Sequence, residues 1–144
     1  LNEKIAIMRQ DPVLFNDTLR NNLTMYRDIC DDELIALLQK LNLHKFATPE
    51  GLDSVIREGG SNLSGGERKR IALARTLLRK APITIIDEPL ANVDSETAEK
   101  IEDILTELSG GIVFVITHHF SDDKKKAFAK AFCFSHSRVE QGGI

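Results

Sequence analysis

The sequence predicts an α/β fold, because short apolar runs alternate along the chain with longer segments of helical periodicity. Four of these runs are rich in β-branched or aromatic residues and have the length of buried strands. A long, mostly helical segment separates the first run from the second. This order predicts a mainly parallel sheet, flanked by helices, with an α-helical subdomain inserted into it. The expected strands are Ile5–Met8, 83–86, Ile112–Ile116 and 131–134.

Three amphipathic segments predict the helices that pack beside these strands. They cover residues 31–41, Gly65–Leu78 and 95–108. In the last of them Ile101 and Leu105 belong to an apolar stripe at helical spacing, so that one side of the helix is expected to be buried.

The composition indicates a packed globular unit. The chain has 144 residues and a mass of 16.1 kDa, which is enough for one folding unit and too little for two independent cores. Its 42% hydrophobic and 28% charged residues exclude a disordered tail and a low-complexity segment. A net charge of −3 is too balanced for a protein whose whole surface binds nucleic acid.

Further features limit the class of protein. Cys30 and Cys133 lie far apart and outside any Cys/His cluster, so the sequence supports neither a zinc site nor a disulfide framework. Residues 109–121, the longest stretch without charge, are too short to cross a membrane. The chain starts at Leu1 without an initiator methionine or a signal peptide. We therefore expect a soluble piece of a larger protein whose N-terminal part is missing from these residues.

A serine and two glycines stand at the start of the second expected helix. Ser64 and Glu67 have the spacing of a capping box, in which each side chain accepts from the other's backbone N–H. Gly65 and Gly66 are unfavourable in a helix, so local stability does not explain them. Bare N–H groups beside a serine hydroxyl predict a phosphate site. A flexible, serine-capped turn is the structural alternative.

Polar side chains follow three of the expected strands at their carboxyl ends, where ligands of open α/β sheets bind. Asp87 and Glu88 end the second strand, and adjacent strand residues point to opposite sides. One carboxylate can therefore face Mg²⁺ and the other a water molecule; a solvated acidic turn is the alternative. Gln10 follows the first strand and His118 the third, and each of these two is a weak signal alone.

In order and spacing, these motifs together resemble those of the ATP-binding cassette (ABC) ATPases, and the resemblance covers nearly the whole chain. Asp87 and Glu88 resemble the family's Walker B aspartate and the catalytic glutamate that follows it. The other matches are Gln10 with the Q-loop, 63–67 with the signature motif, 91–94 with the D-loop and His118 with the switch histidine.

The resemblance is closest to the exporter branch of the family. Residues 10–23 read like its Q-loop segment, and Glu58 like the glutamate of its X-loop. The fold implied is a partial P-loop NTPase-type core with an inserted helical subdomain, the C-terminal portion of an ABC ATPase domain. Its implied parts are a core strand and Q-loop at 1–15, the helical subdomain and signature helix at 16–80, and a core with Walker B, D-loop and switch histidine at 81–144.

In this family two ATPase domains stack head to tail, with each ATP between the two. The resemblance implies that Ser64, Gly65 and Gly66, together with Glu67, bind the γ-phosphate of an ATP held by the partner domain. It also implies that Asp94 helps to organise the dimer interface.

The same resemblance implies roles at the strand ends. Asp87 and Gln10 would hold Mg²⁺, Glu88 would act as general base on the attacking water, and His118 would contact the γ-phosphate. The implied partners are a second ABC ATPase domain and a transmembrane domain. The complete protein is thereby expected at the cytoplasmic face of the membrane, where ATP hydrolysis powers export.

One motif of the family is missing. No G-x-x-x-x-G-K-[ST] sequence, the Walker A loop that cradles the β- and γ-phosphates, occurs in these 144 residues. We therefore expect the fragment alone neither to bind ATP tightly nor to hydrolyse it. The D-loop and the Walker B strand also depart from the family's usual residues, at Ala91, Asn92 and Thr84.

Two other functions stay open at the level of sequence. The chain could be a non-catalytic interaction module that donates its signature motif to a partner. It could also belong to a soluble ABC ATPase that acts on nucleic acid, because basic residues are frequent in 68–80. We expect those charges to form a solvated helix face and intramolecular pairs, so nucleic acid is not an expected partner.

Overall fold

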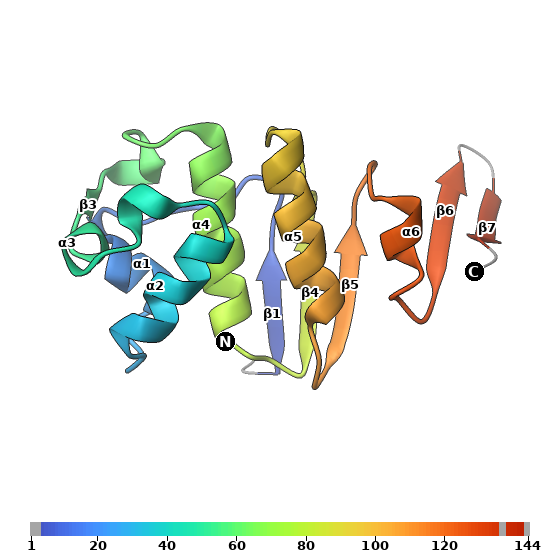
Figure 1. The fold of residues 1–144 in the computed structure, drawn as a ribbon, viewed down its shortest axis with the longest axis horizontal. Helices are drawn as coiled ribbons and strands as arrows, with labels where there is room; N and C mark the ends of the chain where they lie inside the picture. The colour runs from blue at the N-terminus through green and yellow to red at the C-terminus, as the bar shows by residue number, and fades with distance from the viewer. Residues whose placement is uncertain (1–3, 136–137, 143–144) are drawn as a thin grey trace.

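A parallel sheet of three strands forms the centre of the molecule (Figure 1). The computed structural model describes residues 4–135 and 138–142, with side chains through residue 132. The strands β1 (Ile5–Met8), β4 (Ile83–Asp87) and β5 (Ile112–Ile116) lie in the order β1-β4-β5. All neighbours in this sheet are parallel, so the three carboxyl ends share one edge.

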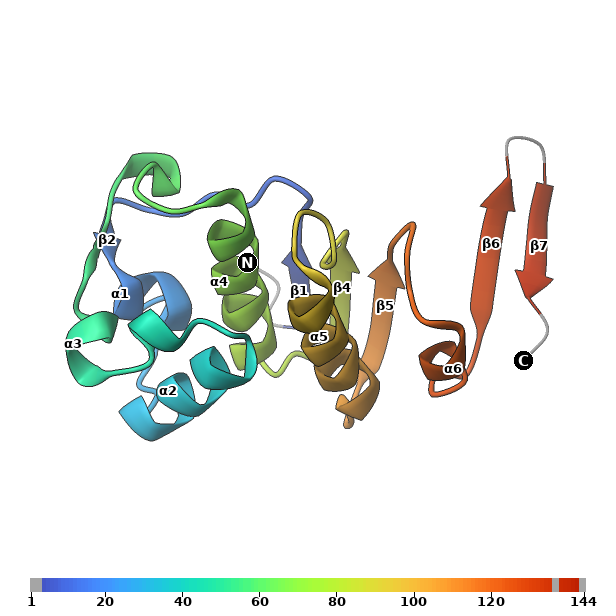
Figure 2. The ribbon, with the colours of Figure 1, turned by 45° about the horizontal axis from the view of Figure 1, so that its top comes forward.

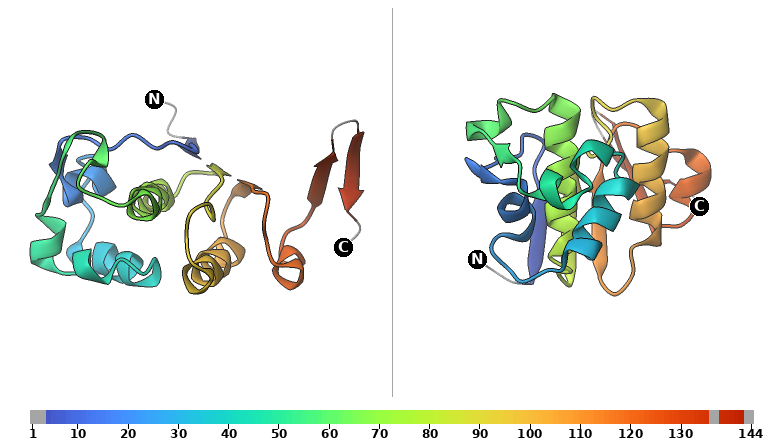
Figure 3. Two further views of the ribbon diagram at one scale, coloured as in Figure 1. Left: turned by 90° about the horizontal axis from the view of Figure 1, so that it is seen from above. Right: turned by 60° about the vertical axis from the view of Figure 1, so that its left-hand side comes forward.

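One face of the sheet is covered and the other is bare. The helices α4 (Gly65–Leu78) and α5 (Ser95–Glu107) lie on the same side of the strands (Figure 3). Towards them the strands bury Met8 and Ile86, which are 2% and 0% exposed. On the opposite side Ile112 and Phe114 are more than half exposed, at 57% and 54%. Parallel sheets normally have both faces covered.

A group of short elements forms the helical region, residues 17–60, at one end of the molecule (Figure 2). Leucines at helical spacing, among them Leu34 and Leu38, are fully buried there. They belong to the same hydrophobic core as the buried residues of α4. Its elements are β2 (Asp17–Thr18), α1 (Leu19–Thr24), α2 (Asp31–Lys40), η1 (His44–Phe46), α3 (Pro49–Leu52), β3 (Val55–Ile56) and η2 (Glu58–Gly60).

The fold class predicted from the sequence is confirmed. Strands β1 and β5 and helix α4 have the predicted bounds, while β4 extends one residue further, to Asp87, and α2 and α5 each end one residue earlier. The chain also forms elements too short to leave a periodic pattern, such as the two-residue strands β2 and β3, which pair antiparallel.

The fourth apolar run does not join the parallel sheet. It forms β6 (Ala131–Ser135), which follows the short helix α6 (Asp122–Lys125) and pairs antiparallel with β7 (Arg138–Gly142). None of the helices in the described ranges is long and apolar enough to cross a membrane. Cys30 is a free, exposed thiol, and the prediction for Cys133 concerns a side chain outside the described part.

Candidate active site

The polar residues predicted at the strand ends lie at one edge of the sheet. Asp87 is the last residue of β4 and pairs in register with Ile116, the last residue of β5. Gln10 follows β1, the other neighbour of β4, by two residues and is exposed. The parallel register therefore places Gln10, Asp87 and the start of the loop after β5 at a common edge, where α/β sheets bind ligands.

Glu88 and His118 are in contact at this edge. The Nε2 atom of His118 lies 3.2 Å from Oε1 of Glu88, and the Glu88 side chain is only 12% exposed. The backbone N–H of Glu88 donates to the carbonyl of Ile116 at 2.8 Å, which ties the turn after β4 to the end of β5. The structure therefore brings together two residues that are 30 positions apart in the sequence.

The strand alternation used to separate Asp87 from Glu88 does not extend to Glu88. Glu88 has φ 52°, a left-handed backbone conformation that residues other than glycine rarely adopt. Its direction is therefore set by a turn that the hydrogen bond to β5 holds, not by the pleat of β4. Backbone strain of this kind is common where a side chain must be aimed at a reaction site.

The residues at the edge fit a magnesium ion bound mainly by a nucleotide. Among the described residues there is no group of three or more His, Cys, Asp or Glu that could hold a metal ion without help. Mg²⁺ usually takes one or two carboxylates and completes its shell with phosphates and water. One carboxylate, Asp87, and the amide of Gln10 are consistent with that requirement.

The turn before α4 has the predicted capping box. Ser64 Oγ accepts from the N–H of Glu67 at 3.1 Å, and the Glu67 carboxylate accepts from the N–H of Ser64 at 2.9 Å. The N–H groups of Gly65 and Gly66 have no acceptor within the described ranges, as is usual for the first turn of a helix. They point out of a helix of 14 residues, a geometry that suits an anion.

Glu67 holds this turn in two ways. Besides accepting from Ser64, its carboxylate lies 2.6 Å from Nζ of Lys45 in η1. Burial of the Glu67 carboxylate opposes its ionisation, but the bonds from Lys45 and Ser64 outweigh burial and lower its pKa. The signature turn is thus fastened to the helical region by an ion pair.

Gly66 also lets the signature turn approach the segment after β4. A Cβ atom on Gly66 would lie 3.1 Å from the carbonyl oxygen of Asn92, whereas one on Gly65 would meet nothing closer than 4.0 Å. Asn92 itself has φ 63°, a conformation that asparagine tolerates. The two motifs, 63–67 and 91–94, therefore pack together within one chain.

Asp94, predicted at a dimer interface, caps α5 in this chain. Its carboxylate accepts from the N–H of Thr97 at 2.9 Å and from the hydroxyl of Thr97 at 2.7 Å. These bonds lower the pKa of Asp94. Its role between domains stays a prediction.

On α4 Lys69 is buried and Arg70 is partly buried, which the sequence did not reveal. Arg70 donates to the carbonyls of Gly66 at 3.1 Å and Asn42 at 2.9 Å, and Asn42 donates in turn to Thr97 at 3.0 Å. Lys69 is only 8% exposed, so the expectation of a solvated face was wrong for it. The Arg70 bond to Asn42 attaches α4 to the segment that follows α2.

Two residues of the helical region and α4 hold residues 13–15, the segment after Gln10. Asn22, fully buried, accepts from the N–H of Phe15 at 2.8 Å and donates to its carbonyl at 3.0 Å. Arg75 donates to the carbonyl of Val13 at 2.9 Å and lies over the Phe15 ring at 5.8 Å. Burial lowers the pKa of Arg75. The spacing of these residues in the sequence did not indicate that Asn22 or Arg75 contacts residues 13–15.

The family model described as ABC transporter matches residues 1–91, more than half of the chain. The chain belongs to the ABC transporter family. The two principal predicted motifs, the signature turn and the Walker B strand, lie within this match, whereas His118 lies beyond it.

Similar proteins include two ATP-dependent lipid A-core flippases and an ABC transporter. The chain is 42% identical to an ATP-dependent lipid A-core flippase of Syntrophus aciditrophicus over 84% of its own length and 21% of that protein. It is 38% identical to the flippase of Dechloromonas aromatica, over 97% of the chain and 25% of that protein. It is 40% identical to ABC transporter C family member 12 of Dictyostelium discoideum, over 84% of the chain and 9% of that protein. The chain thus spans about a quarter or less of these relatives.

A solved structure supports the same fold. The structure of a bacterial Atm1-family ABC exporter with ATP bound matches 81% of this chain and 21% of that chain, with a TM-score of 0.71 and 33% sequence identity. The fold described above is therefore that of the ATPase domain of ABC exporters, as the sequence predicted.

Proposed function

We propose that this chain is the part of an ABC exporter's ATPase domain that supplies the catalytic carboxylate for one ATP and the signature motif for another. The contact between Glu88 and His118 at the carboxyl ends of β4 and β5 carries this proposal. It joins a partly buried carboxylate to an exposed imidazole at the edge where a nucleotide would bind. The boundaries 1–15, 16–80 and 81–144 divide the chain by motif in this proposal.

At the strand edge each residue has a separate task. Glu88 accepts a proton from the attacking water, because its carboxylate is held by the turn and aimed at the edge. His118 donates a hydrogen bond to the γ-phosphate oxygen, and Gln10 orients the water. Mg²⁺ would be held by Asp87 and Gln10 and would supply positive charge to the phosphates.

At the signature turn the chain would serve a second ATPase domain. Ser64, Gly65 and Gly66 present a hydroxyl and two N–H groups to the γ-phosphate of the ATP held by that domain. Glu67 keeps the turn in shape, and Asp94 lies beside the interface. A head-to-tail pair of domains would bring each signature turn opposite the other domain's strand edge.

The bare sheet face supports the view that part of the domain is missing from these residues. Ile7, Ile112 and Phe114 are each more than half exposed there, although a parallel sheet is stable when both faces are covered. The segment carrying Walker A would pack on this face. A transmembrane domain would contact residues 13–15, where the apolar side chains of Val13 and Phe15 are 66% and 46% exposed. The complete exporter would then act at the cytoplasmic face of the membrane.

Joining residues 1–144 behind the Walker A portion of the Syntrophus flippase's ATPase domain tests this proposal. We expect this completed domain to hydrolyse ATP, and Glu88→Gln to reduce kcat by about a thousandfold, in the range of other lost catalytic groups. Glu99→Gln, an exposed glutamate on α5, is the matched control. Residues 1–144 alone should show no ATP binding in the micromolar range by calorimetry.

Three results would contradict the proposal. They are hydrolysis that survives Glu88→Gln, micromolar ATP binding by residues 1–144 alone, and a completed domain that folds and binds ATP without hydrolysing it. The last result would favour a non-catalytic module that only donates its signature motif.

A further inference from the structure

Glu102 is a buried carboxylate that the proposed chemistry does not use. It lies on α5 and is 5% exposed, although the sequence shows it only as one of several acidic residues in an amphipathic helix. Burying a carboxylate is unfavourable unless hydrogen bonds and an opposite charge replace its water. Its partners therefore indicate what the carboxylate does.

The partners of Glu102 belong to the segment that follows His118. Oε1 of Glu102 accepts from the N–H of Ser121 at 2.8 Å, and Oε2 accepts from the Ser121 hydroxyl at 2.6 Å. Lys124 lies 3.7 Å from Oε2 and supplies the opposite charge, although its shorter ion pair, 2.7 Å, is with Asp103. The carboxylate thus holds Ser121 through both of its oxygens.

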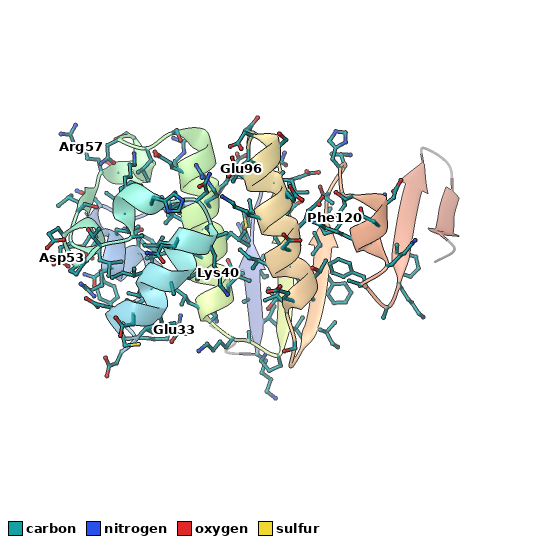
Figure 4. All side chains as sticks on the ribbon, viewed as in Figure 1. Glu33, Lys40, Asp53, Arg57, Glu96 and Phe120 are labelled. Carbon is teal, nitrogen blue, oxygen red and sulfur yellow. The ribbon has the colours of Figure 1, made fainter. Side chains whose placement is uncertain are left out.

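Ser121 is one end of a loop whose other end continues directly from β5. The loop, residues 117–121, joins β5 to α6 (Figure 4). At its start the Thr117 hydroxyl donates to the carbonyl of His119 at 2.9 Å and accepts from its N–H at 3.3 Å. Phe120 packs edge-on against Phe128, with ring centroids 5.5 Å apart. Five residues are therefore held between β5 and Glu102.

His118 depends on this loop for its position. Its side chain is 87% exposed and, within the described part of the chain, contacts Glu88. An exposed side chain without packing is placed mainly by its own backbone. The distance between His118 and Glu88 is thus governed by β5 at one end of the loop and by the Ser121 bonds to Glu102 at the other.

We propose that Glu102 is a positioning residue for His118, acting through Ser121. This inference rests on the proposed function, in which His118 contacts the γ-phosphate. In that function Glu102, which is bonded to Ser121, would touch neither the nucleotide nor the reacting atoms. By holding Ser121 it restricts the conformations of the loop, so that the His118 imidazole is already close to Glu88 before the nucleotide binds.

A purely structural role is the alternative, because Ser121 also precedes α6 and its contact with α5 could simply attach that helix. Both roles predict lower stability when Glu102 is removed. Only the positioning role predicts that the loop's amides are loosened selectively and that kcat falls while KM for ATP does not rise.

The first measurement uses residues 1–144. Amide hydrogen exchange is followed in the unsubstituted chain and in Glu102→Ala, Glu102→Gln and Glu99→Ala, the last an exposed glutamate of the same helix. In Glu102→Ala we expect exchange in residues 118–121 to accelerate about tenfold or more, while α5 and the strands keep their rates. Glu102→Gln keeps an acceptor for the Ser121 N–H and should restore most of the protection.

The second measurement uses the completed domain. Glu102→Ala should lower kcat about tenfold and leave KM for ATP within about twofold, whereas Glu99→Ala should change neither. In a His118→Ala background, adding Glu102→Ala should have no further effect, because the residue that it positions is gone.

The outcomes separate this inference from the proposed function. Uniform acceleration of exchange, an unchanged loop, or equal and additive kinetic losses in the His118→Ala background would overturn the positioning role. If the completed domain proves inactive, the proposed function fails, and selective loosening of the loop in the exchange measurement still decides whether Glu102 holds it.

Discussion

The two faces of the central sheet are built from similar residues and differ in what covers them. Ile86, on the face under α4 and α5, is 0% exposed, whereas Ile112 on the neighbouring strand is 57% exposed on the opposite face. Both are β-branched residues of a parallel sheet, a setting in which both faces are usually buried. The difference teaches that the apolar residues of the bare face are suited to a covering layer that the described residues do not provide.

The largest effect should come from truncating the two isoleucines separately. Ile86→Ala should lower the free energy of unfolding of the chain by about 2–5 kcal/mol, because it leaves a cavity under α4. Ile112→Ala should change it by only about 0.5 kcal/mol, as an exposed substitution does. Urea unfolding followed by circular dichroism measures both, and equal effects would mean that the bare face is buried in solution.

In the completed domain the same pair sharpens the comparison. Ile112→Ala should then become destabilising by about 1–3 kcal/mol, because the Walker A portion would cover it. An effect that stays near zero there would show that the added portion does not pack on this face.

The next largest effect should come from the buried side-chain amide of Asn22 in the helical region. There the comparison is between a buried polar side chain that bonds to the backbone and a partly buried one. Asn22→Ala removes the partners of the Phe15 N–H and carbonyl and should lower the free energy of unfolding by about 1–3 kcal/mol. Asn21→Ala, which loses only a bond to Asp17, should change it by about 0.5 kcal/mol. Thermal unfolding of both variants tests this, and similar losses would contradict it.

The two glycines of the signature turn extend the comparison to a position with space for a side chain and a position without it. Alanine is favoured over glycine in a helix by about 0.5–1 kcal/mol. Gly65→Ala should gain part of that, because its Cβ would meet nothing closer than 4.0 Å, whereas Gly66→Ala should gain less or lose, because its Cβ would lie 3.1 Å from the Asn92 carbonyl oxygen. Urea midpoints measure the difference, and a more stable Gly66→Ala variant would contradict the packing described.

The smallest effect concerns pH. The folded-state pKa of Asp94 lies below its ordinary value of 3.8, since the N–H and hydroxyl of Thr97 bond to its carboxylate. A lowered pKa contributes stability above the unfolded value, and this contribution is lost as pH falls below about 3.8 and through the folded pKa. The unfolding midpoint measured between about pH 6 and pH 2.5 should therefore fall less steeply for Asp94→Asn. An unaltered slope would show that the cap contributes nothing.

Much of the fold and part of the candidate site follow from local patterns. Apolar runs located the three parallel strands, and the Ser64–Glu67 spacing located the start of α4, because both patterns depend on neighbouring residues. Burial of Lys69 and Glu102 could not be predicted in this way, since it depends on partners distant in the sequence. The direction of Glu88 was likewise hidden, because its left-handed φ is set by a hydrogen bond to another strand.

The bonds that hold residues 13–15 have a mechanical consequence. Asn22 and Arg75 attach this segment to α1 and α4, whereas residues 9–12 make no hydrogen bond or ion pair with the rest of the described chain. If α1 and α4 move together relative to the sheet, residues 13–15 must move with them as one rigid unit. Bending is then concentrated in residues 9–12, so that such a movement changes the distance between Gln10 and the sheet.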